Sequence, residues 1–217
     1  MSKLVILGTA HGSNVPGKCS PDKKFREYLY SRVICRLLQG ELTARGVRSV
    51  IDIPDETEPS LAYRTDLVNK IVAKNGGKDN CIYVSIHVNA AGSDGKWHNA
   101  GGWCAFTTVG TTKADALAEC LYEFARVRLA PYADIMDKGK KHGDYSPAQR
   151  PFRIDKSDGD SDLESNFWVL RKTTCPAVLT ENLFQDNKSD VNFLLSNSGM
   201  LAIVALHADG ICKYLGV

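Results

Sequence analysis

The sequence predicts an α/β fold: a single domain in which a twisted, mostly parallel sheet is flanked by helices on both faces. Short apolar runs bounded by polar or glycine-rich residues recur along the chain, and such runs are typical of buried parallel strands. Helical patterns alternate with these runs, as they do in α/β proteins. The 217 residues are enough for one full hydrophobic core, and no repeat or linker divides them. We therefore expect residues 1–217 to form one domain.

The first third of the chain predicts strands and helices in alternation. The apolar run over 3–11 predicts the first strand, and a loop rich in glycine, proline and serine follows it. A long helical pattern covers 23–45 and stops at Gly46, a residue type favoured just after helix ends. Residues 47–53 predict the second strand, and 59–74 predict a helix that begins with proline.

The middle of the chain continues this alternation and then loses it. Residues 81–87 and 103–108 predict strands, and 113–129 predict a helix. The stretch 131–165 is polar, charged and weakly patterned. It is long for a connection within a compact domain, so we expect a functional or mobile loop or insertion, such as a groove wall or a regulatory lid.

The C-terminal part returns to clear patterns. Residues 167–170 and 177–181 predict two more strands. Helices are expected near 188–196 and 199–215.

The bulk composition narrows the class of protein. Apolar residues make up 43% of the chain and charged residues 24%, as in ordinary globular domains. The formal net charge of +2 and the absence of a dense basic run give no support for nucleic-acid binding. No apolar run reaches the ~18 residues of a membrane span.

Cysteine usage and the N-terminus indicate where the chain is made. The seven cysteines are scattered and include no CxxC pair, which favours a reducing compartment over a disulfide framework. Met1 to Lys3 lead directly into the first predicted strand, without the apolar core of a signal peptide. We expect synthesis in the cytoplasm, with action elsewhere only after release or export by a route other than a visible signal.

Three of the apolar runs end in residues that bind metals or move protons. Two end in a histidine, His11 and His87, and a third ends in Glu181. Ligands of open α/β sheets lie outside the carboxyl ends of the strands, so we expect these side chains at one edge. Two imidazoles and a carboxylate are the parts of a metal-assisted hydrolytic site.

Glu27 is the candidate for a third metal ligand. Catalytic zinc is usually held by three protein ligands drawn from histidine and carboxylate. On a helical wheel, Glu27 shares the apolar, inward stripe with Tyr30, Ile34 and Leu38. A carboxylate on that stripe needs a partner, and a metal ion is one.

Each of these residues also has an ordinary structural interpretation. A histidine at a strand end is often a satisfied structural residue. Glu27 could instead complement the dipole of its helix, and Glu181 could cap the helix that follows. A hydrolase with a cysteine nucleophile is disfavoured, because no cysteine follows a glycine-rich turn at a helix start.

Four motifs occur together in an order known from one enzyme family. They are Gly8-Thr-Ala-His11-Gly, Glu27 in the first helix, Ser85-Ile-His87-Val-Asn-Ala90 and Pro176-Ala-Val-Leu-Thr-Glu181. Leu61-Ala-Tyr-Arg64 and Val169-Leu-Arg171 fit the same order. The chain thereby resembles the zinc-dependent N-acetylmuramoyl-L-alanine amidases of the amidase-3 type, which include cell-division amidases and many phage endolysins.

The resemblance implies a zinc site and a reaction. One zinc ion would be held by His11, Glu27 and His87, with Glu181 as the catalytic base and acid. Glu181 would take a proton from zinc-bound water and pass it to the leaving nitrogen. The bond cleaved would be the amide between N-acetylmuramic acid and L-alanine in peptidoglycan. One departure follows Glu181: the family often has Gly-Phe within three residues of this glutamate, whereas this chain has Asn182-Leu-Phe184, with the phenylalanine but not the glycine.

Partners and alternatives remain expectations at this point. Peptidoglycan is the expected partner and the chain is expected to be a monomer. Asn89 and Arg64 are candidate substrate-binding residues, although Asn89 could hold its loop and Arg64 could pair with a carboxylate of the fold. A zinc peptidase that cuts within the stem peptide would use the same ligands. A non-catalytic wall-binding module would require the loss of a ligand or of Glu181, and all are present.

Overall fold

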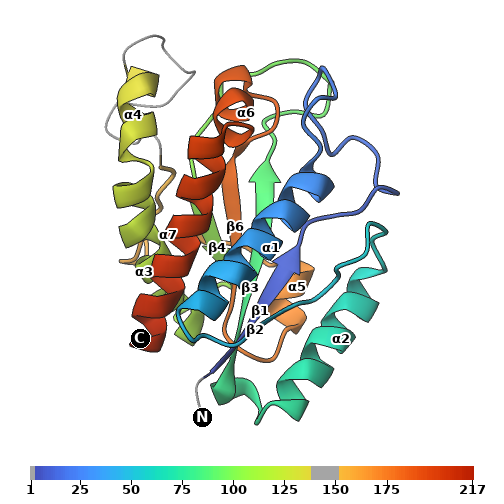
Figure 1. Ribbon diagram of the computed structural model, residues 1–217, viewed down its shortest axis with the longest axis vertical. Helices are drawn as coiled ribbons and strands as arrows, with labels where there is room; N and C mark the ends of the chain where they lie inside the picture. Colours follow the sequence, from blue (N-terminus) through green and yellow to red (C-terminus); the bar gives the residue numbers. More distant parts are fainter. Residues whose placement is uncertain (1–2, 138–151) are drawn as a thin grey trace.

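The computed structural model describes residues 3–137 and 152–217, with side chains for all of these except 134–137. It confirms a single α/β domain built on a six-stranded sheet (Figure 1). The strands are β1 Leu4–Thr9, β2 Ser49–Ile51, β3 Cys81–Asn89, β4 Cys104–Thr107, β5 Leu163–Glu164 and β6 Ala177–Phe184. The helices are α1 Glu27–Ala44, α2 Leu61–Lys74, α3 Lys113–Arg128, α4 Ala130–Asp137, α5 Trp168–Lys172, α6 Lys188–Leu194 and α7 Asn197–Leu215, with a 3-10 turn at Lys78–Asn80.

The sheet is mostly parallel, as the sequence predicts. Its strand order is β2-β1-β3-β6-β4-β5. The pairs β1–β2, β1–β3, β3–β6 and β4–β5 are parallel, and only β4–β6 is antiparallel. The carboxyl ends of β1, β3 and β6 therefore lie next to one another, and His87 is in register with Glu181.

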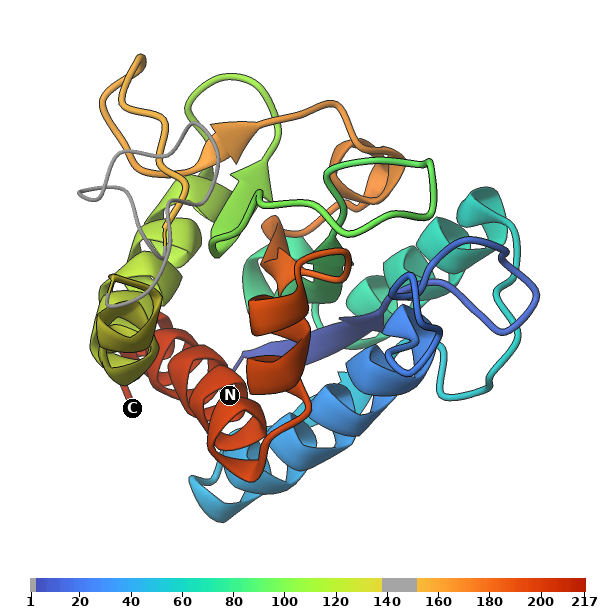
Figure 2. The same cartoon turned by 90° about the horizontal axis from the view of Figure 1, so that it is seen from above.

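Helices cover both faces of the sheet, and each face has its own apolar core. On one face α1, α3 and α7 pack against side chains such as Val5, Leu7 and Val84. On the other face α2 and α5 pack against Ile6 and Tyr83. Seen from above, α1 and α7 lie side by side, with α2 across the sheet (Figure 2). Strand residues alternate between the two cores, as the period of two requires.

The segment expected as a strand over 167–170 is a short helix, α5. Four apolar residues in a row do not distinguish a strand from one buried helical turn. Val169 and Leu170 are buried in the core under α2, while Phe167 and Trp168 remain partly exposed. The indole nitrogen of Trp168 also lies 3.3 Å from the Thr65 hydroxyl of α2. Packing against α2 therefore overrides the strand preference of the run.

The first helix begins at Glu27, four residues later than the predicted Lys23. Lys23 has a φ of +61°, a left-handed conformation that does not fit a helix. Cys19 and Arg26 form an isolated antiparallel bridge around this turn. The turn delays the helix and places Glu27 in its first position.

The stretch expected as a polar insertion over 131–165 is only partly described. The start of this stretch forms most of α4, and β5 lies near the end of the stretch. Phe152 bridges to Trp103 beside the sheet. Residues 138–151 lie outside the described residues, so the proposed lid or groove wall stays a prediction.

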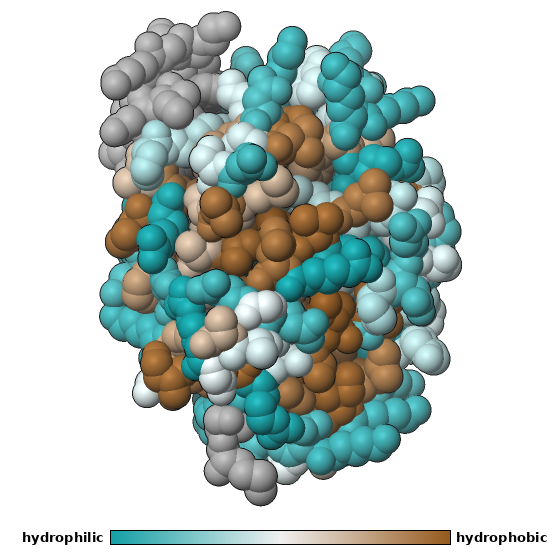
Figure 3. Space-filling model, in the orientation of Figure 1, coloured by the Kyte–Doolittle hydropathy of each residue, from teal (hydrophilic) through white to brown (hydrophobic). Residues whose placement is uncertain are grey.

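One apolar stripe is exposed on the outer face of α1. Leu29, Val33 and Leu37 follow one another at helical spacing and are 42%, 40% and 46% exposed. Figure 3 shows apolar surface among charged side chains on the face where α1 and α7 lie. Exposed apolar patches can mark interaction surfaces, so the expected monomer stays a prediction.

No single described helix has the length and apolar composition needed to cross a membrane; α6 and α7 meet that test only as a pair bent by 79°.

A buried histidine, His207 on α7, makes the stability of the domain depend on pH. Its Nδ1 donates to the Ile203 carbonyl at 2.7 Å, and its Nε2 accepts from the Thr180 hydroxyl at 2.9 Å. Burial lowers the pKa of His207 to about 4. The unfolded chain, with a histidine pKa of ~6.5, binds the proton more readily, so stability is lost as the pH falls from about 6.5 to 4.

We expect His207→Gln to remove this part of the pH dependence. Between pH 7 and pH 4 the wild type should lose about 3 kcal/mol more of its free energy of unfolding than the variant. Urea denaturation of both proteins at the two pH values measures this difference. Equal losses in the two proteins would contradict a neutral buried His207.

Candidate metal centre

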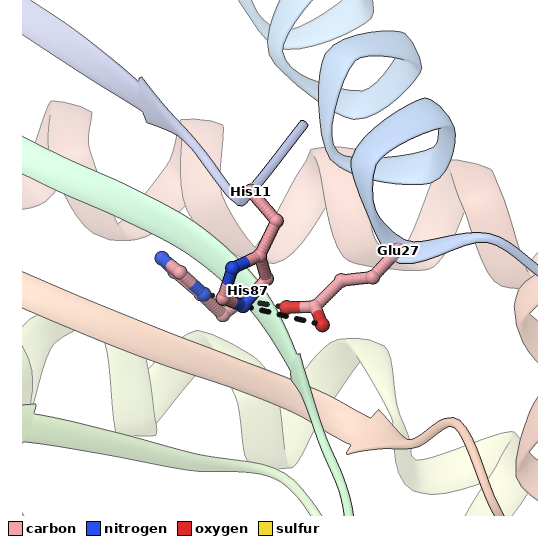
Figure 4. A group of neighbouring side chains, drawn as sticks. All are labelled: His11, Glu27 and His87. Atoms are coloured by element: carbon pink, nitrogen blue, oxygen red, sulfur yellow. Dashed lines mark ion pairs between the residues drawn. The ribbon is translucent and has the colours of Figure 1, made fainter. Parts of the chain in front are cut away.

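The three predicted metal ligands meet at the carboxyl edge of the sheet. His11 follows the end of β1, His87 lies near the end of β3, and Glu27 is the first residue of α1. One potential ligand atom from each lies within 4.8 Å of the other two. Figure 4 shows both imidazole rings turned toward the Glu27 carboxylate.

The Glu27 carboxylate lies between the two histidines. Its Oε2 is 3.6 Å from Nε2 of His11, and its Oε1 is 3.3 Å from Nδ1 of His87. Oε1 also accepts the backbone N–H of Val88 at 3.0 Å. Burial would raise the pKa of Glu27, but its contact with His87 and the charges of His87 and His11 outweigh burial and lower it. Glu27 therefore stays ionised, as a metal ligand must.

The turn that carries His11 is held from α1. His11 has a φ of +44°, which is unusual for a residue with a side chain. Arg32 donates to the carbonyl oxygens of Ala10 and His11 at 3.0 and 2.9 Å. The Ser31 hydroxyl accepts the Ala10 N–H at 2.8 Å and donates to Ile86 at 2.6 Å. These bonds tie the ends of β1 and β3 to α1, which also carries Glu27.

A second carboxylate, Glu58, contacts the outer nitrogen of His11. Its Oε2 lies 3.5 Å from Nδ1 of His11, and its Oε1 lies 3.6 Å from Nη2 of Arg64. Burial opposes ionisation, but contact with His11 and the charges of His11 and Arg64 lower the pKa of Glu58. A Cβ on Gly12 would stand 2.1 Å from the Glu58 backbone nitrogen, so this approach requires glycine. Sequence reasoning missed Glu58.

The outer nitrogen of His87 is held by a buried polar chain. Nε2 of His87 lies 3.1 Å from the Ser85 hydroxyl. The Ser85 hydroxyl is in turn hydrogen-bonded to the Tyr83 hydroxyl. The Tyr83 hydroxyl donates to Asp52 at 3.0 Å, and Arg64 donates to the same oxygen at 2.7 Å. The two imidazoles are thus oriented by contacts that lead back to Arg64.

Arg64 is consequently placed as part of the fold. The side chain is buried, pairs with Asp52 and donates to the Thr9 carbonyl at 2.7 Å. Burial opposes its charge, but Asp52, Tyr83 and Glu58 raise the pKa of Arg64. Contact of Arg64 with substrate stays a prediction.

Glu181, which is in register with His87, lies beside the three predicted ligands and is not among the residues grouped with them. Its Oε2 is buried and has no hydrogen-bond partner among the described residues. Burial, followed by the nearby charge of Glu27, raises the pKa of Glu181 well above its usual range. This carboxyl therefore holds a proton more readily than an ordinary glutamate does.

A cleft of about 240 Å³ opens over these residues. His11, His87 and Glu181 line it together with Glu58 and Arg64. Its remaining wall includes the partly exposed apolar side chains Leu61, Phe167 and Trp168. Phe167 and Trp168 lie at the start of the helix α5 and line the cleft. The strand expected over 167–170 did not predict this position.

Two other residues discussed in the sequence analysis, Asn89 and Asn182, are also at this edge of the sheet. Asn89 is outside the residues that line this cleft, and its Oδ1 accepts the Ala90 N–H at 2.8 Å. Substrate contact by Asn89 stays a prediction. Asn182 is fully buried: it donates to the His87 carbonyl at 2.9 Å and accepts from the Trp103 indole at 2.8 Å. Asn182 therefore ties β6 to the strand of His87.

The chain is similar to known proteins over its whole length. The chain is 27% identical over 224 residues to an endolysin of Bacillus phage SPP1. The alignment covers all of this chain and 68% of the endolysin. It is 26% identical over 209 residues to a sporulation-specific N-acetylmuramoyl-L-alanine amidase of Bacillus subtilis, covering 95% of this chain and 66% of that protein. The chain thus spans about two thirds of these relatives.

Solved structures share the fold. An N-acetylmuramoyl-L-alanine amidase from Clostridium difficile 630 superposes with a TM-score of 0.75 at 21% identity, over 99% of this chain and 97% of that one. The catalytic domain of the CD27L endolysin gives a TM-score of 0.64 at 17% identity, over 98% of both chains. The amidase-3 family model, described as N-acetylmuramoyl-L-alanine amidase, matches residues 5–213. Since that match covers nearly the whole chain, this protein belongs to the N-acetylmuramoyl-L-alanine amidase family.

Proposed function

We propose that this chain is a zinc-dependent hydrolase that cleaves the amide between N-acetylmuramic acid and L-alanine in peptidoglycan. The observation that carries the proposal is the convergence of His11, Glu27 and His87 beside a buried, unpartnered Glu181. Family membership supports the bond cleaved, and the donor set supports the metal.

The three side chains fit zinc by their chemistry. Two imidazole nitrogens and one carboxylate are a common donor set of catalytic zinc, which leaves a further position open. Glu27 is almost completely buried, and two imidazoles face its carboxylate. No described lysine or arginine forms an ion pair with this carboxylate. When bound, zinc would supply a Lewis acid that polarises the scissile carbonyl and makes water more acidic.

Glu181 would carry the proton in this reaction. As a base it would accept a proton from the attacking water, and as an acid it would deliver that proton to the leaving nitrogen. Its raised pKa favours the second step, because a carboxyl with a raised pKa takes up and holds a proton more readily than an ordinary glutamate. Leu61, Phe167 and Trp168 would pack against apolar parts of the substrate.

The cell wall is the proposed place of action. Relatives named as an endolysin and as amidases support peptidoglycan as the partner. We propose that the chain reaches the wall after release from the cell in which it is made.

Mass spectrometry of digested cell walls tests the proposal. Purified protein should contain about one zinc per chain and release free stem peptides whose N-terminus is L-alanine. A chelator should stop the release, and added zinc should restore it. Disaccharide-peptides that lack only terminal stem residues would identify a peptidase, and an inactive, zinc-free protein would leave only a wall-binding role.

Glu58 should strengthen zinc binding by orienting His11. Carboxylates that hold the outer nitrogen of a ligating histidine typically contribute 10–100-fold in metal affinity. We expect Glu58→Ala to weaken zinc affinity by about 10–100-fold. Competition with a chromogenic chelator measures this change in Kd.

Glu56→Ala is the matched control for this measurement. Glu56 is exposed, lies two residues earlier and makes no side-chain hydrogen bond or ion pair with a described residue. The Glu56→Ala variant should bind zinc with the same affinity as the wild type. Equal affinities for Glu58→Ala and the wild type would show that Glu58 does not position His11.

A further inference from the structure

The segment that leads into β5 has an aspartate at every second position, three in all. Asp158, Asp160 and Asp162 are separated by single small residues. Asp162 lies beside the end of β4, where its Oδ2 accepts the Thr107 hydroxyl at 2.6 Å. Because β4 runs antiparallel to β6, this end lies toward the amino end of β6, away from Glu181. The cluster is therefore separate from the candidate metal centre.

Two carboxyl groups of this segment face each other. Asp160 and Asp162 lie within hydrogen-bonding reach of one another. Asp162 is 1% exposed, and its Oδ1 is buried without a hydrogen-bond partner among residues 3–137 and 152–217. The Oδ1 atom of Asp160 is also buried and unpartnered. Two ionised carboxylates at this distance repel each other unless a proton or a cation lies between them.

No described basic side chain neutralises the pair. The nearest candidates, Arg126 and Lys156, contact the Ser161 hydroxyl at 3.3 and 2.8 Å, and neither forms an ion pair with Asp160 or Asp162. The neighbouring Asp115 adds negative charge, although its own oxygens accept from Thr112. Burial, followed by the charges of Asp160 and Asp115, raises the pKa of Asp162 to about 7. Because neither Arg126 nor Lys156 pairs with these aspartates, the described residues give the cluster no positive partner.

We propose that Asp160 and Asp162 bind a calcium ion. The donors are hard carboxylate oxygens without histidine or cysteine, which favours calcium over zinc. No third described carboxylate joins the pair at the spacing found for His11, Glu27 and His87. Calcium accepts backbone carbonyls and water as its other ligands, and a site with two carboxylates fits the weak binding of extracellular modules, with Kd of about 0.1–1 mM.

The ion would have a structural role. Asp162 is bonded to β4 through Thr107, and Ser161 is bonded to Arg126 of α3. Calcium would hold the segment 152–164 against these two elements. This role does not depend on the proposed amidase reaction, so either proposal can fail alone.

Calcium titration of the purified full chain tests the site. Thermal unfolding is followed in calcium-free buffer and with added calcium chloride, and calorimetry measures Kd. We expect the midpoint temperature to rise by about 3–6 °C when free calcium is about ten times Kd. Magnesium chloride at equal ionic strength should give a much smaller shift, because magnesium demands regular octahedral geometry.

Three aspartate variants assign the response. Asp162→Asn and the less buried Asp160→Asn should both lose the calcium-dependent shift. Asp155→Asn should keep it, since its carboxylate bonds only the Ser157 N–H of its own turn. The proposal is overturned if the wild type shows no calcium response, if magnesium acts equally, or if the shift survives in both pair variants. A pair that only shares a proton would be stabilised by acid and not by calcium.

Discussion

Glu181→Gln is expected to abolish turnover while the protein keeps one zinc per chain. Glutamine preserves the size of the side chain but neither accepts nor delivers a proton. Loss of a general acid–base group typically costs 10²–10⁴-fold in rate, so we expect kcat to fall by at least about 100-fold. Release of stem peptides gives the rate, and elemental analysis gives the zinc content.

The same measurements on a control separate a chemical effect from a structural one. Glu164→Gln changes a carboxylate on β5 that accepts the Gly110 N–H and is not among the residues that line the cleft. It should retain wild-type turnover and zinc content. A fully active Glu181→Gln protein would show that Glu181 is not the proton carrier.

Most of the sheet was predictable because its strands are buried on both faces. Such strands read as unbroken apolar runs, and the three runs that lead to His11, His87 and Glu181 correspond to β1, β3 and β6. The match between His87 and Glu181 then follows from parallel pairing of β3 with β6. Both strands continue past these residues, to Asn89 and Phe184, and Asn182 in this extension of β6 donates to the His87 carbonyl.

The parts that sequence reasoning missed depend on tertiary contacts. The run over 167–170 became a helix because α2 offers it a packing surface, which no local pattern records. Glu58 reads as one of several acidic residues in a loop. Its contact with His11 arises only because Gly12 lets the two loops approach, and a single sequence does not show that approach.

Glu27→Gln is expected to remove zinc from the protein as well as activity. Glutamine keeps the shape of Glu27 but not the negative charge that faces both imidazoles. Removing a direct ligand should weaken zinc affinity by more than the ~100-fold upper value for supporting residues. Zinc content after dialysis and Kd by chelator competition measure the loss. Glu41→Gln on the same helix, where Glu41 pairs with Arg45 near the surface, should keep its zinc.

The contrast between the two glutamine variants separates the roles of two buried glutamates. Contact with His87 and His11 lowers the pKa of Glu27 in spite of burial, whereas burial and the charge of Glu27 raise that of Glu181. The carboxylate with the lowered pKa suits a cation, and the carboxyl with the raised pKa suits proton transfer. Glu181→Gln should therefore yield an inactive protein with zinc, and Glu27→Gln an inactive protein without it. Zinc retained in Glu27→Gln, or lost from Glu181→Gln, would contradict this division of roles.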